Sequence, residues 1–164
     1  MKVYLLRHAK AEPGHADAGR RRAGKGRLDA ERLGSFLRGK EDFRPGEAWV
    51  SPLVRAGETA GIFLQALNPE GRGPLVERTE DLLEPERDPK PIIESLGGMG
   101  RDVLLVGHNP NLEILFSLLV SGQRSGARIH LKTCVLVCLE WLPWAAPGVS
   151  GTCSLRWILD PRLI

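Results

Sequence analysis

The stretch that decides the fold opens the chain and reads Lys2-Val3-Tyr4-Leu5-Leu6-Arg7-His8-Ala9. Its four residues from Val3 to Leu6 form an uninterrupted apolar run, which is typical of a strand buried on both faces of a parallel sheet. Such a strand carries Arg7 and His8 at its carboxyl end. In open α/β sheets ligands bind in the crevice beyond that end, so a cation beside a neutral nucleophile indicates an anionic substrate.

Working outward, the composition is that of one soluble globular domain spanning 1–164. The chain has 164 residues, of which 42% are apolar and 26% charged, a balance typical of ordinary globular proteins. Of its 23 cationic residues 17 are arginine, which suits bidentate recognition of phosphate or carboxylate. The three cysteines form no Cys-x-x-Cys pair and lie in strand-like surroundings, so we expect inert core thiols rather than disulfides or a zinc site.

The same patterns argue against a membrane or nucleic-acid partner. No apolar run is long enough to span a bilayer, and Arg7 interrupts any hydrophobic segment of a signal peptide, so we expect a cytoplasmic protein. The basic run Arg20-Arg21-Arg22 has no interleaved aromatic residues. That run therefore indicates a solvated loop beside the first strand rather than a nucleic-acid groove.

Hydrophobic periodicity predicts a three-layer α/β/α fold whose sheet is mostly parallel, with an antiparallel hairpin at its C-terminal edge. One helix should start with Ser51 as N-cap and Pro52 as its first residue, and another with Asn109 and Pro110 in the same roles. We expect strands at 3–6, 48–50, 75–77, 103–106, 131–141 and 153–159, and helices at 27–38, 52–67, 91–96 and 110–121.

Two further segments place charged or nucleophilic side chains at the same edge of the sheet as Arg7 and His8. Arg55 falls off the buried stripe of its helix, near the helix N-terminus, where free N–H groups favour an anion. His108 lies between the strand at 103–106 and the following helix. Two arginines and two histidines in one crevice indicate that the protein handles a phosphoryl group.

Three motifs resemble the signatures of the histidine phosphatase superfamily, the phosphoglycerate mutase-like enzymes. They are Leu6-Arg7-His8-Ala9, Ser51-Pro52-Leu53-Val54-Arg55-Ala56-Gly57-Glu58-Thr59 and Val106-Gly107-His108-Asn109-Pro110. The short chain resembles the SixA-type phosphohistidine phosphatase branch, and the match runs in order from residue 3 to about residue 120. The resemblance implies that His8 is the nucleophile and that Arg7, Arg55 and His108 contact the phosphoryl group.

The implied reaction needs no metal and no cofactor. A neutral imidazole attacks phosphorus, so hydrolysis is divided into phosphorylation of His8 and attack by water. The arginines and the helix N-terminus supply the charge compensation that a metal provides elsewhere. A phosphate or sulfate ion is expected to occupy the same site.

The sequence departs from the family pattern at two places. The branch commonly carries Arg-Pro-Leu-Thr before the first helix; Arg20 takes the place of that arginine, with Arg21 and Arg22 as alternatives. Relatives of the mutase and acid phosphatase type place a proton-donating acid in the loop before the His108 strand. Glu84 is the candidate here, with Glu86 and Asp88 as alternatives, although the SixA-type branch often lacks this acid.

The main interpretation is a phosphatase that acts on a phosphohistidine of another protein, of the histidine phosphotransfer type. A small-molecule phosphomonoesterase or a phosphoglycerate mutase is the enzymatic alternative, and the short chain without insertions disfavours the mutase. A phosphoprotein-binding module without activity is the third hypothesis. Binding requires cations but no nucleophile, so the presence of His8 argues against the third hypothesis.

Overall fold

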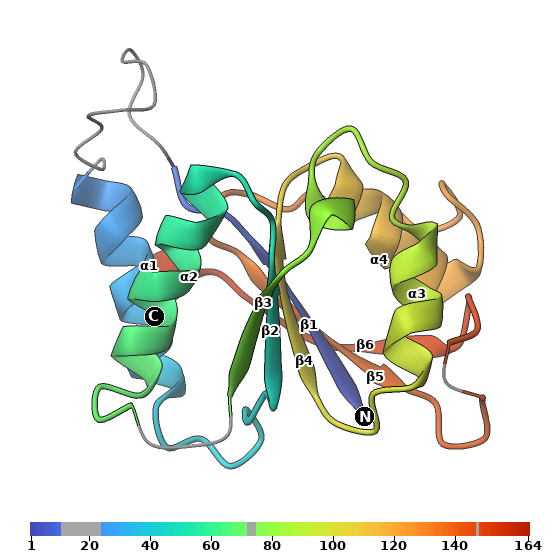
Figure 1. Ribbon diagram of the computed structural model, residues 1–164, viewed down its shortest axis with the longest axis horizontal. Helices are drawn as coiled ribbons and strands as arrows, with labels where there is room; N and C mark the ends of the chain where they lie inside the picture. The colour runs from blue at the N-terminus through green and yellow to red at the C-terminus, as the bar shows by residue number, and fades with distance from the viewer. Residues whose placement is uncertain (11–23, 72–74, 147) are drawn as a thin grey trace.

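The computed structural model describes residues 1–10, 24–71, 75–146 and 148–164, which build one sheet with helices on both of its faces (Figure 1). The described strands are β1 (Lys2–Arg7), β2 (Glu47–Val50), β3 (Val76–Thr79), β4 (Val103–Gly107), β5 (Leu136–Trp141) and β6 (Cys153–Leu159). The described helices are α1 (Gly24–Leu37), α2 (Val54–Leu67), α3 (Lys90–Gly97) and α4 (Asn111–Ser121), with short 3-10 helices η1 (Asp81–Leu83) and η2 (Pro161–Leu163).

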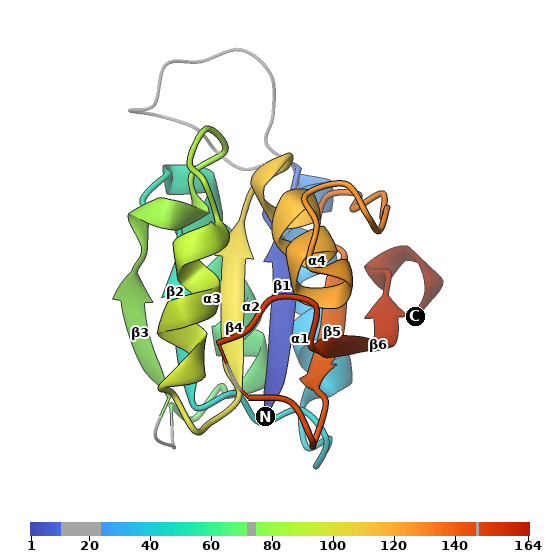
Figure 2. The same cartoon turned by 90° about the vertical axis from the view of Figure 1, so that its right-hand side faces the viewer.

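The sheet has the strand order β3-β2-β4-β1-β5-β6 (Figure 2). Strands β3, β2, β4 and β1 are parallel, whereas β5 is antiparallel to β1 and β6 is antiparallel to β5. The expected fold class is confirmed, including the antiparallel hairpin at the C-terminal edge. Because β1, β2 and β4 are parallel neighbours, their carboxyl ends meet at one edge of the sheet, the upper edge in Figure 2.

The two faces of the sheet explain why the opening apolar run has no polar interruption. Tyr4 and Leu6 pack into the core beneath α1 and α2, while Val3 and Leu5 pack into the core beneath α3 and α4. All four side chains are fully buried. Successive side chains of a strand point to opposite faces, so a strand covered on both faces must be apolar at every position. This arrangement fixes Arg7 and His8 where the covered part of the strand ends.

Helix α2 begins later than the Ser51-Pro52 pattern predicts, and that prediction is wrong. The helix starts at Val54 with Leu53 as its N-cap, and no side chain caps it. Ser51 instead continues the sheet, because its backbone N–H donates to the Val106 carbonyl at 2.9 Å. Its hydroxyl lies 2.9 Å from Nε2 of His108. The Ser51 hydroxyl therefore contacts His108 and accepts from the Leu53 N–H at 3.4 Å, ahead of the helix, instead of capping it.

The predicted start of α4 is wrong for the same reason. The helix begins at Asn111, Pro110 occupies the cap position, and the Asn109–Pro110 peptide bond is cis. The Asn109 side chain does not cap the helix. Its amide donates to Oε1 of Glu113 at 2.7 Å and to the Leu131 carbonyl at 3.0 Å, so it ties the turn after β4 to the segment before β5.

Strand β5 is shorter than predicted, because residues 131–135 wrap around the end of β1 before the strand begins at Leu136. Cys134 has a positive φ of 62°, and its N–H donates to the carbonyls of Arg7 and His8 at 3.1 and 3.3 Å. The three cysteines are free and buried, as expected. Burial raises the pKa of each thiol, which keeps them protonated and unreactive at neutral pH.

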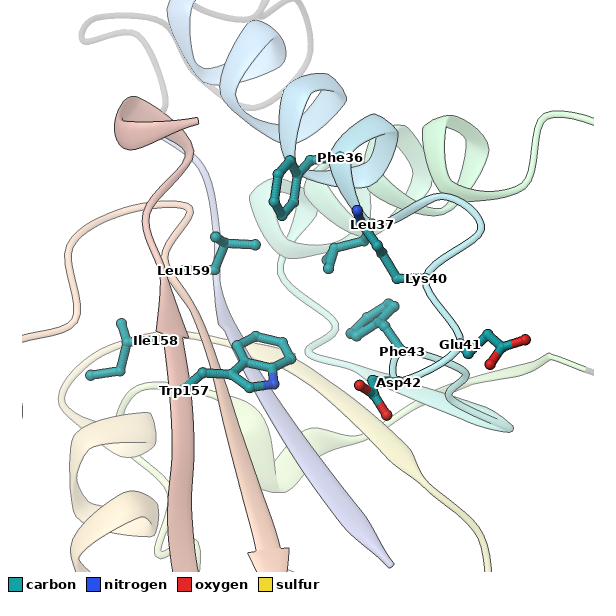
Figure 3. A pocket seen from close by; sticks show the side chains of 9 residues that line it. All are labelled: Phe36, Leu37, Lys40, Glu41, Asp42, Phe43, Trp157, Ile158 and Leu159. Atoms are coloured by element: carbon teal, nitrogen blue, oxygen red, sulfur yellow. The ribbon is translucent and has the colours of Figure 1, made fainter.

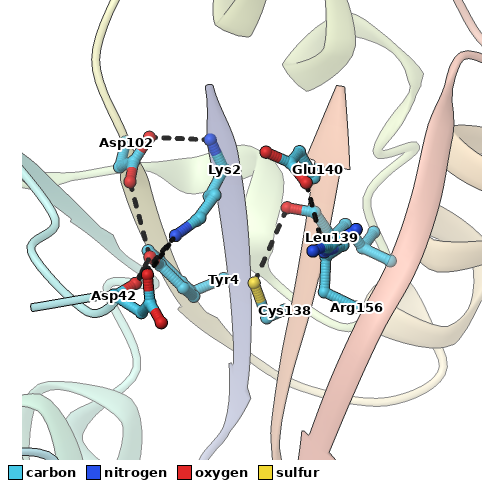
Figure 4. A network of polar contacts seen from close by, with 8 residues as sticks. All are labelled: Lys2, Tyr4, Asp42, Asp102, Cys138, Leu139, Glu140 and Arg156. Carbon is cyan, nitrogen blue, oxygen red and sulfur yellow. Dashed lines mark hydrogen bonds and ion pairs between the residues drawn. The ribbon is translucent and has the colours of Figure 1, made fainter. Parts of the chain in front are cut away.

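A polar network holds the amino end of β1, opposite the edge that carries His8 (Figure 4). The Lys2 backbone N–H donates to Oδ1 of Asp102 at 2.7 Å. The hydroxyl of buried Tyr4 donates to the Asp42 carbonyl at 2.9 Å, so the phenol of this core residue is satisfied. Burial, followed by the Asp102 charge, raises the pKa of Tyr4 well above its usual range. The network fixes the register of β1 at its start.

An apolar groove of about 330 Å³ lies between the C-terminal end of α1 and the edge strand β6 (Figure 3). Its apolar lining includes Phe36, Phe43 and Trp157, with Lys40, Glu41 and Asp42 along one side. The tilted rings of Phe43 and Trp157 lie 6.5 Å apart between centroids.

None of the described helices combines the length and the apolar character that a membrane-spanning helix needs.

Candidate active site

The candidate site forms where backbone hydrogen bonds continue beyond the ends of three parallel strands. The N–H of His8 donates to the Gly107 carbonyl at 3.0 Å, and the N–H of Ser51 donates to the Val106 carbonyl at 2.9 Å. These two bonds bring the residues that follow β1, β2 and β4 side by side. The three motifs singled out in the sequence therefore meet at one edge of the sheet.

His8 is half-buried, and its ring is held in one tautomer. Nδ1 lies 2.8 Å from the Ala9 carbonyl oxygen. A carbonyl only accepts hydrogen bonds, so we assign the proton of the neutral ring to Nδ1. The assignment leaves the lone pair on Nε2, and this nitrogen is the one available to attack an electrophile.

His108 lies next to His8 and is almost fully buried, with 1% of its surface exposed. The two imidazole rings are 4.8 Å apart between centroids. Nε of Arg55 donates to Nδ1 of His108 at 3.3 Å. Arginine has no acceptor, so Nδ1 must carry a lone pair and Nε2–H donates to the Ser51 hydroxyl. The contacts from α2 and from the end of β2 thus orient this ring.

Both histidines are neutral at physiological pH. Burial and the nearby charges of Arg55 and Arg7 together lower the pKa of His8 to about 4, against the Ala9 hydrogen bond, which raises it. Burial also lowers the pKa of His108 to about 3, with further contributions from His8, Arg55 and Arg7. The charges of the two arginines destabilise an additional proton on either ring. An anion bound here would reverse that effect, since opposite charges favour protonation of a base.

Arg7 lies at the end of β1, and its side chain reaches the segment that precedes β5. Its Nη1 donates to the Leu131 carbonyl at 2.6 Å. Its Nε is buried and has no hydrogen-bond partner among the described residues. A buried donor without a partner is costly, so this guanidinium is suited to receive an oxygen atom of a ligand.

Ser51 and Thr59 are functional candidates that the sequence analysis missed. Oγ1 of Thr59 accepts from the Ala9 N–H at 2.9 Å and donates to the Arg55 carbonyl at 2.7 Å. Thr59 thereby ties the residue after His8 to the helix that carries Arg55. Both polar residues are buried and both lie inside the quoted Ser-Pro motif; their positions in that motif were the only available signal.

The loop that carries the candidate acid lies beside the His108 turn. A Cβ on Gly107 would meet the Leu83 carbonyl at 3.1 Å, so glycine allows this close approach. The Asn111 amide donates to the carbonyls of Leu82 and Arg87 at 2.9 and 3.0 Å. Both contacts hold the loop against the end of β4 and the start of α4.

The three acid candidates differ in their surroundings. Glu84 is half-buried, with Oε1 at 3.5 Å from Nε of Arg87. Asp88 is exposed, and its Oδ1 accepts from Nη1 of Arg124 at 2.8 Å. The hydrogen bond from the Lys90 N–H, followed by the bond from Arg124, lowers the pKa of Asp88, which makes this residue a poor proton donor. Glu86 is exposed.

The remaining predicted site residue, Arg20, lies outside the described residues, as do its alternatives Arg21 and Arg22. Within the described ranges, no group of three or more His, Cys, Asp and Glu side chains could hold a metal ion.

Comparison with known proteins places this geometry on a known fold. No family model matches the sequence, and a search of curated protein sequences finds no match. Solved structures do match. The protein histidine phosphatase SixA in complex with tungstate has a TM-score of 0.79 and 20% identity, with 99% of each chain covered.

Two further solved structures are similar along nearly the whole chain. A protein of Agrobacterium tumefaciens, provisionally named phosphohistidine phosphatase SixA, has a TM-score of 0.70 and 22% identity over 98% of this chain and 97% of its own. The mycobacterial glucosyl-3-phosphoglycerate phosphatase Rv2419c has a TM-score of 0.64 and 16% identity over 94% and 96%. The fold implied by the three motifs, that of the SixA-type histidine phosphatases, is therefore confirmed.

Proposed function

We propose that this protein is a histidine phosphatase that removes phosphoryl groups from phosphohistidine on another protein, through a phosphorylated His8. One observation carries the proposal. The neutral His8 ring, with its lone pair on Nε2, lies among Arg7, Arg55 and His108. A neutral imidazole needs no general base, and with adjacent cations it is suited to attack phosphorus, because phosphoryl transfer depends on positioning and electrostatic stabilisation.

In the first step, Nε2 of His8 forms a bond to phosphorus while the bond from phosphorus to the substrate nitrogen breaks. The His8 ring gains positive charge as its lone pair is used. The Nδ1–H bond to the Ala9 carbonyl lies where that charge develops and raises the pKa of the ring, so it stabilises the intermediate. The departing imidazole of the substrate leaves neutral if its other nitrogen already carries a proton.

In the second step, water attacks the phosphorus, the bond to Nε2 breaks, and inorganic phosphate is released. His8 recovers its lone pair and is ready for another turnover. Arg7 and Arg55 are proposed to hold the non-bridging oxygens in both steps. Burial, followed by the charges of His8, Arg55 and Arg7, lowers the pKa of His108, and a bound anion opposes this effect. With the anion bound, the ring would gain a second proton on Nδ1 and donate a hydrogen bond to the phosphoryl group instead of accepting one from Arg55.

The leaving group supports the assignment of the substrate. Expelling an alkoxide requires a proton donor, since general acid catalysis is worth roughly a hundredfold or more. Two of the three acid candidates are paired with an arginine, Glu84 with Arg87 and Asp88 with Arg124, and the third, Glu86, is exposed. A neutral imidazole needs no such donor, so phosphohistidine is the substrate that these surroundings favour.

The test compares kcat/KM for three substrate types: a phosphohistidine protein, an aryl phosphate and an alkyl phosphate. We expect the first two to be cleaved far faster than the third, and Glu84→Gln to change phosphohistidine cleavage only modestly. Glu94→Gln on the exposed face of α3 is the matched control. Efficient alkyl phosphate hydrolysis that collapses in Glu84→Gln would instead favour the small-molecule phosphomonoesterase. Absence of turnover with every substrate would favour the binding module.

The lowered pKa of His8 makes a separate prediction about pH. An unperturbed histidine nucleophile would lose activity below about pH 6.5, where it becomes protonated. Because His8 stays neutral to about pH 4, we expect kcat/KM to remain high from pH 7 to about pH 5. The values are first corrected for the fraction of substrate in each ionisation state, which is measured separately. The acid limb of kcat/KM reports groups of the free enzyme. A limb centred near pH 6.5 would mean that the nucleophile is not in this environment.

A further inference from the structure

A basic pocket of about 410 Å³ opens beside Arg7, and the reaction proposed above does not use it. It is lined by Arg7, Lys10, Lys25, Asp29, His130, Lys132, Thr133 and Arg162. Neither His8, Arg55 nor His108 is among these lining residues. Among the predicted site residues that the structure describes, Arg7 is the one shared by the candidate active site and this pocket. The volume is within the range of sites that hold small ligands or side chains.

The charges around the pocket are strongly unequal. Five of the lining residues are lysine or arginine, whereas Asp29 is the one carboxylate among them. Lys10, Lys25 and Lys132 are exposed, and the charge of Lys132 acts on the nearby Asp160 carboxylate, which pairs with Arg162. Asp29 is buried, with 6% of its surface exposed. Cations that line a concave surface raise the local concentration of anions.

Residues 130–133, which line part of this pocket, are held against β1 by hydrogen bonds. Nη1 of Arg7 donates to the Leu131 carbonyl, next to Lys132 and His130. The Cys134 N–H donates to the carbonyls of Arg7 and His8. The position of Lys132 and Thr133 relative to His8 is therefore set by backbone hydrogen bonds rather than by a loose loop.

Arg162 of the C-terminal helix η2 also lines the pocket, and the position of η2 is fixed by contacts with α1. Nη1 of Arg32 in α1 donates to the Pro161 carbonyl at 3.2 Å. Nε of Arg162 donates to Oδ1 of Asp160 at 2.6 Å, and the backbone N–H of Arg162 donates to the same atom at 3.0 Å. Asp160 thus orients the Arg162 side chain through Nε, which leaves the terminal nitrogens of the guanidinium group for the pocket.

We propose that this basic pocket is a second anion-binding subsite, which takes a carboxylate or phosphate group carried by the same substrate molecule as the transferred phosphoryl group. The proposal rests on the phosphatase function above and specifies its substrate further. Arg7 borders both sites, so the two anionic groups lie next to each other. On a phosphoprotein the second group is an acidic side chain near the phosphohistidine; on a metabolite it is a second phosphate or a carboxylate.

The test uses the whole protein and two pairs of substrates. The first pair is a phosphohistidine peptide with glutamate residues beside the phosphohistidine and the same peptide with glutamine residues there. The second pair is phenyl phosphate with and without a carboxylate on the ring. The quantity measured is the ratio of kcat/KM within each pair, for wild type and for the double variant Lys10→Gln, Lys132→Gln.

Wild type should prefer the acidic member of at least one pair, and the double variant should reduce that ratio roughly tenfold, mainly through KM, as expected for two partly exposed ion contacts. The preference should also shrink with added salt. The matched control is Lys40→Gln, Arg44→Gln, which removes two exposed cations beyond the opposite end of α1. That control should leave the ratio unchanged.

The pair that shows the preference identifies the source of the second group, peptide or small molecule. An enzyme that turns over all four substrates without preference, or a double variant that keeps the wild-type ratio, would overturn the subsite while leaving the phosphatase function intact. Failure to hydrolyse any of the four would instead count against the phosphatase function.

Discussion

Replacing His8 by alanine should abolish turnover of both phosphohistidine and aryl phosphate substrates, with kcat reduced by at least about ten-thousandfold, as for loss of a covalent nucleophile. The reason is that the neighbouring ring cannot substitute. Both nitrogens of His108 are engaged, with Arg55 and with Ser51. The measurement is steady-state hydrolysis of each substrate at pH 7. A variant that retained most of its activity would show that His8 is not the nucleophile.

The free energy of unfolding, measured as a function of pH, shows whether the His8→Ala variant is folded and whether His8 has the lowered pKa. The folded-state pKa of His8 lies below its unfolded value, so the unfolded chain binds the proton first as pH falls. Stability is then lost from about pH 6.5 toward pH 4. Removing His8 removes this loss, so the free energy of unfolding should decrease less between pH 7 and pH 5 in the variant than in wild type.

Replacing Arg7 or Arg55 by alanine should each raise the barrier by roughly 3 kcal/mol, a loss of about a hundredfold to a thousandfold in kcat/KM. The charges of both guanidinium groups act on the two histidine rings, and Nε of Arg55 lies 3.3 Å from Nδ1 of His108, so both are proposed to contact a phosphoryl group bound at Nε2 of His8. Lysine should rescue poorly, because it lacks the planar fork of donors. The measurement is kcat/KM with phosphohistidine and with aryl phosphate.

Arg101→Ala is the matched control for these variants. Arg101 is exposed, pairs with Glu47 at 3.7 Å, and precedes β4 at the amino edge of the sheet. Its removal should leave kcat/KM unchanged. An Arg55 variant with wild-type activity would contradict the proposed role. In the Arg55 variant the pKa of His108 should also rise, since a cation that lowers it is gone, and NMR titration of the ring would show this.

The sheet and the site edge could be predicted from sequence because their signals are local. The runs at Val3 and Val103 are apolar at every position, which only a strand covered on both faces requires. The caps could not be predicted, since their side chains are used by distant partners. Ser51 contacts His108, and Asn109 contacts Leu131; both partners come from elsewhere in the sequence.

The basic pocket could not be predicted for a different reason. Its cationic lining residues are spread over the whole chain: Lys10, Lys25, Lys132 and Arg162. In the sequence, each of them alone indicates only a solvated surface cation. Only the wrapping of residues 131–135 around β1 and the docking of η2 on α1 bring them together.

The most direct test of the covalent mechanism is rapid quench of the enzyme with a substrate whose phosphoryl group is labelled. The transient label should survive base, be lost in acid, and map to His8, because a phosphorus–nitrogen bond to Nε2 is the proposed intermediate. The His8→Ala variant should acquire no label. Label on another residue, or full turnover in wild type with no labelled enzyme at any time, would contradict a phosphorylated His8.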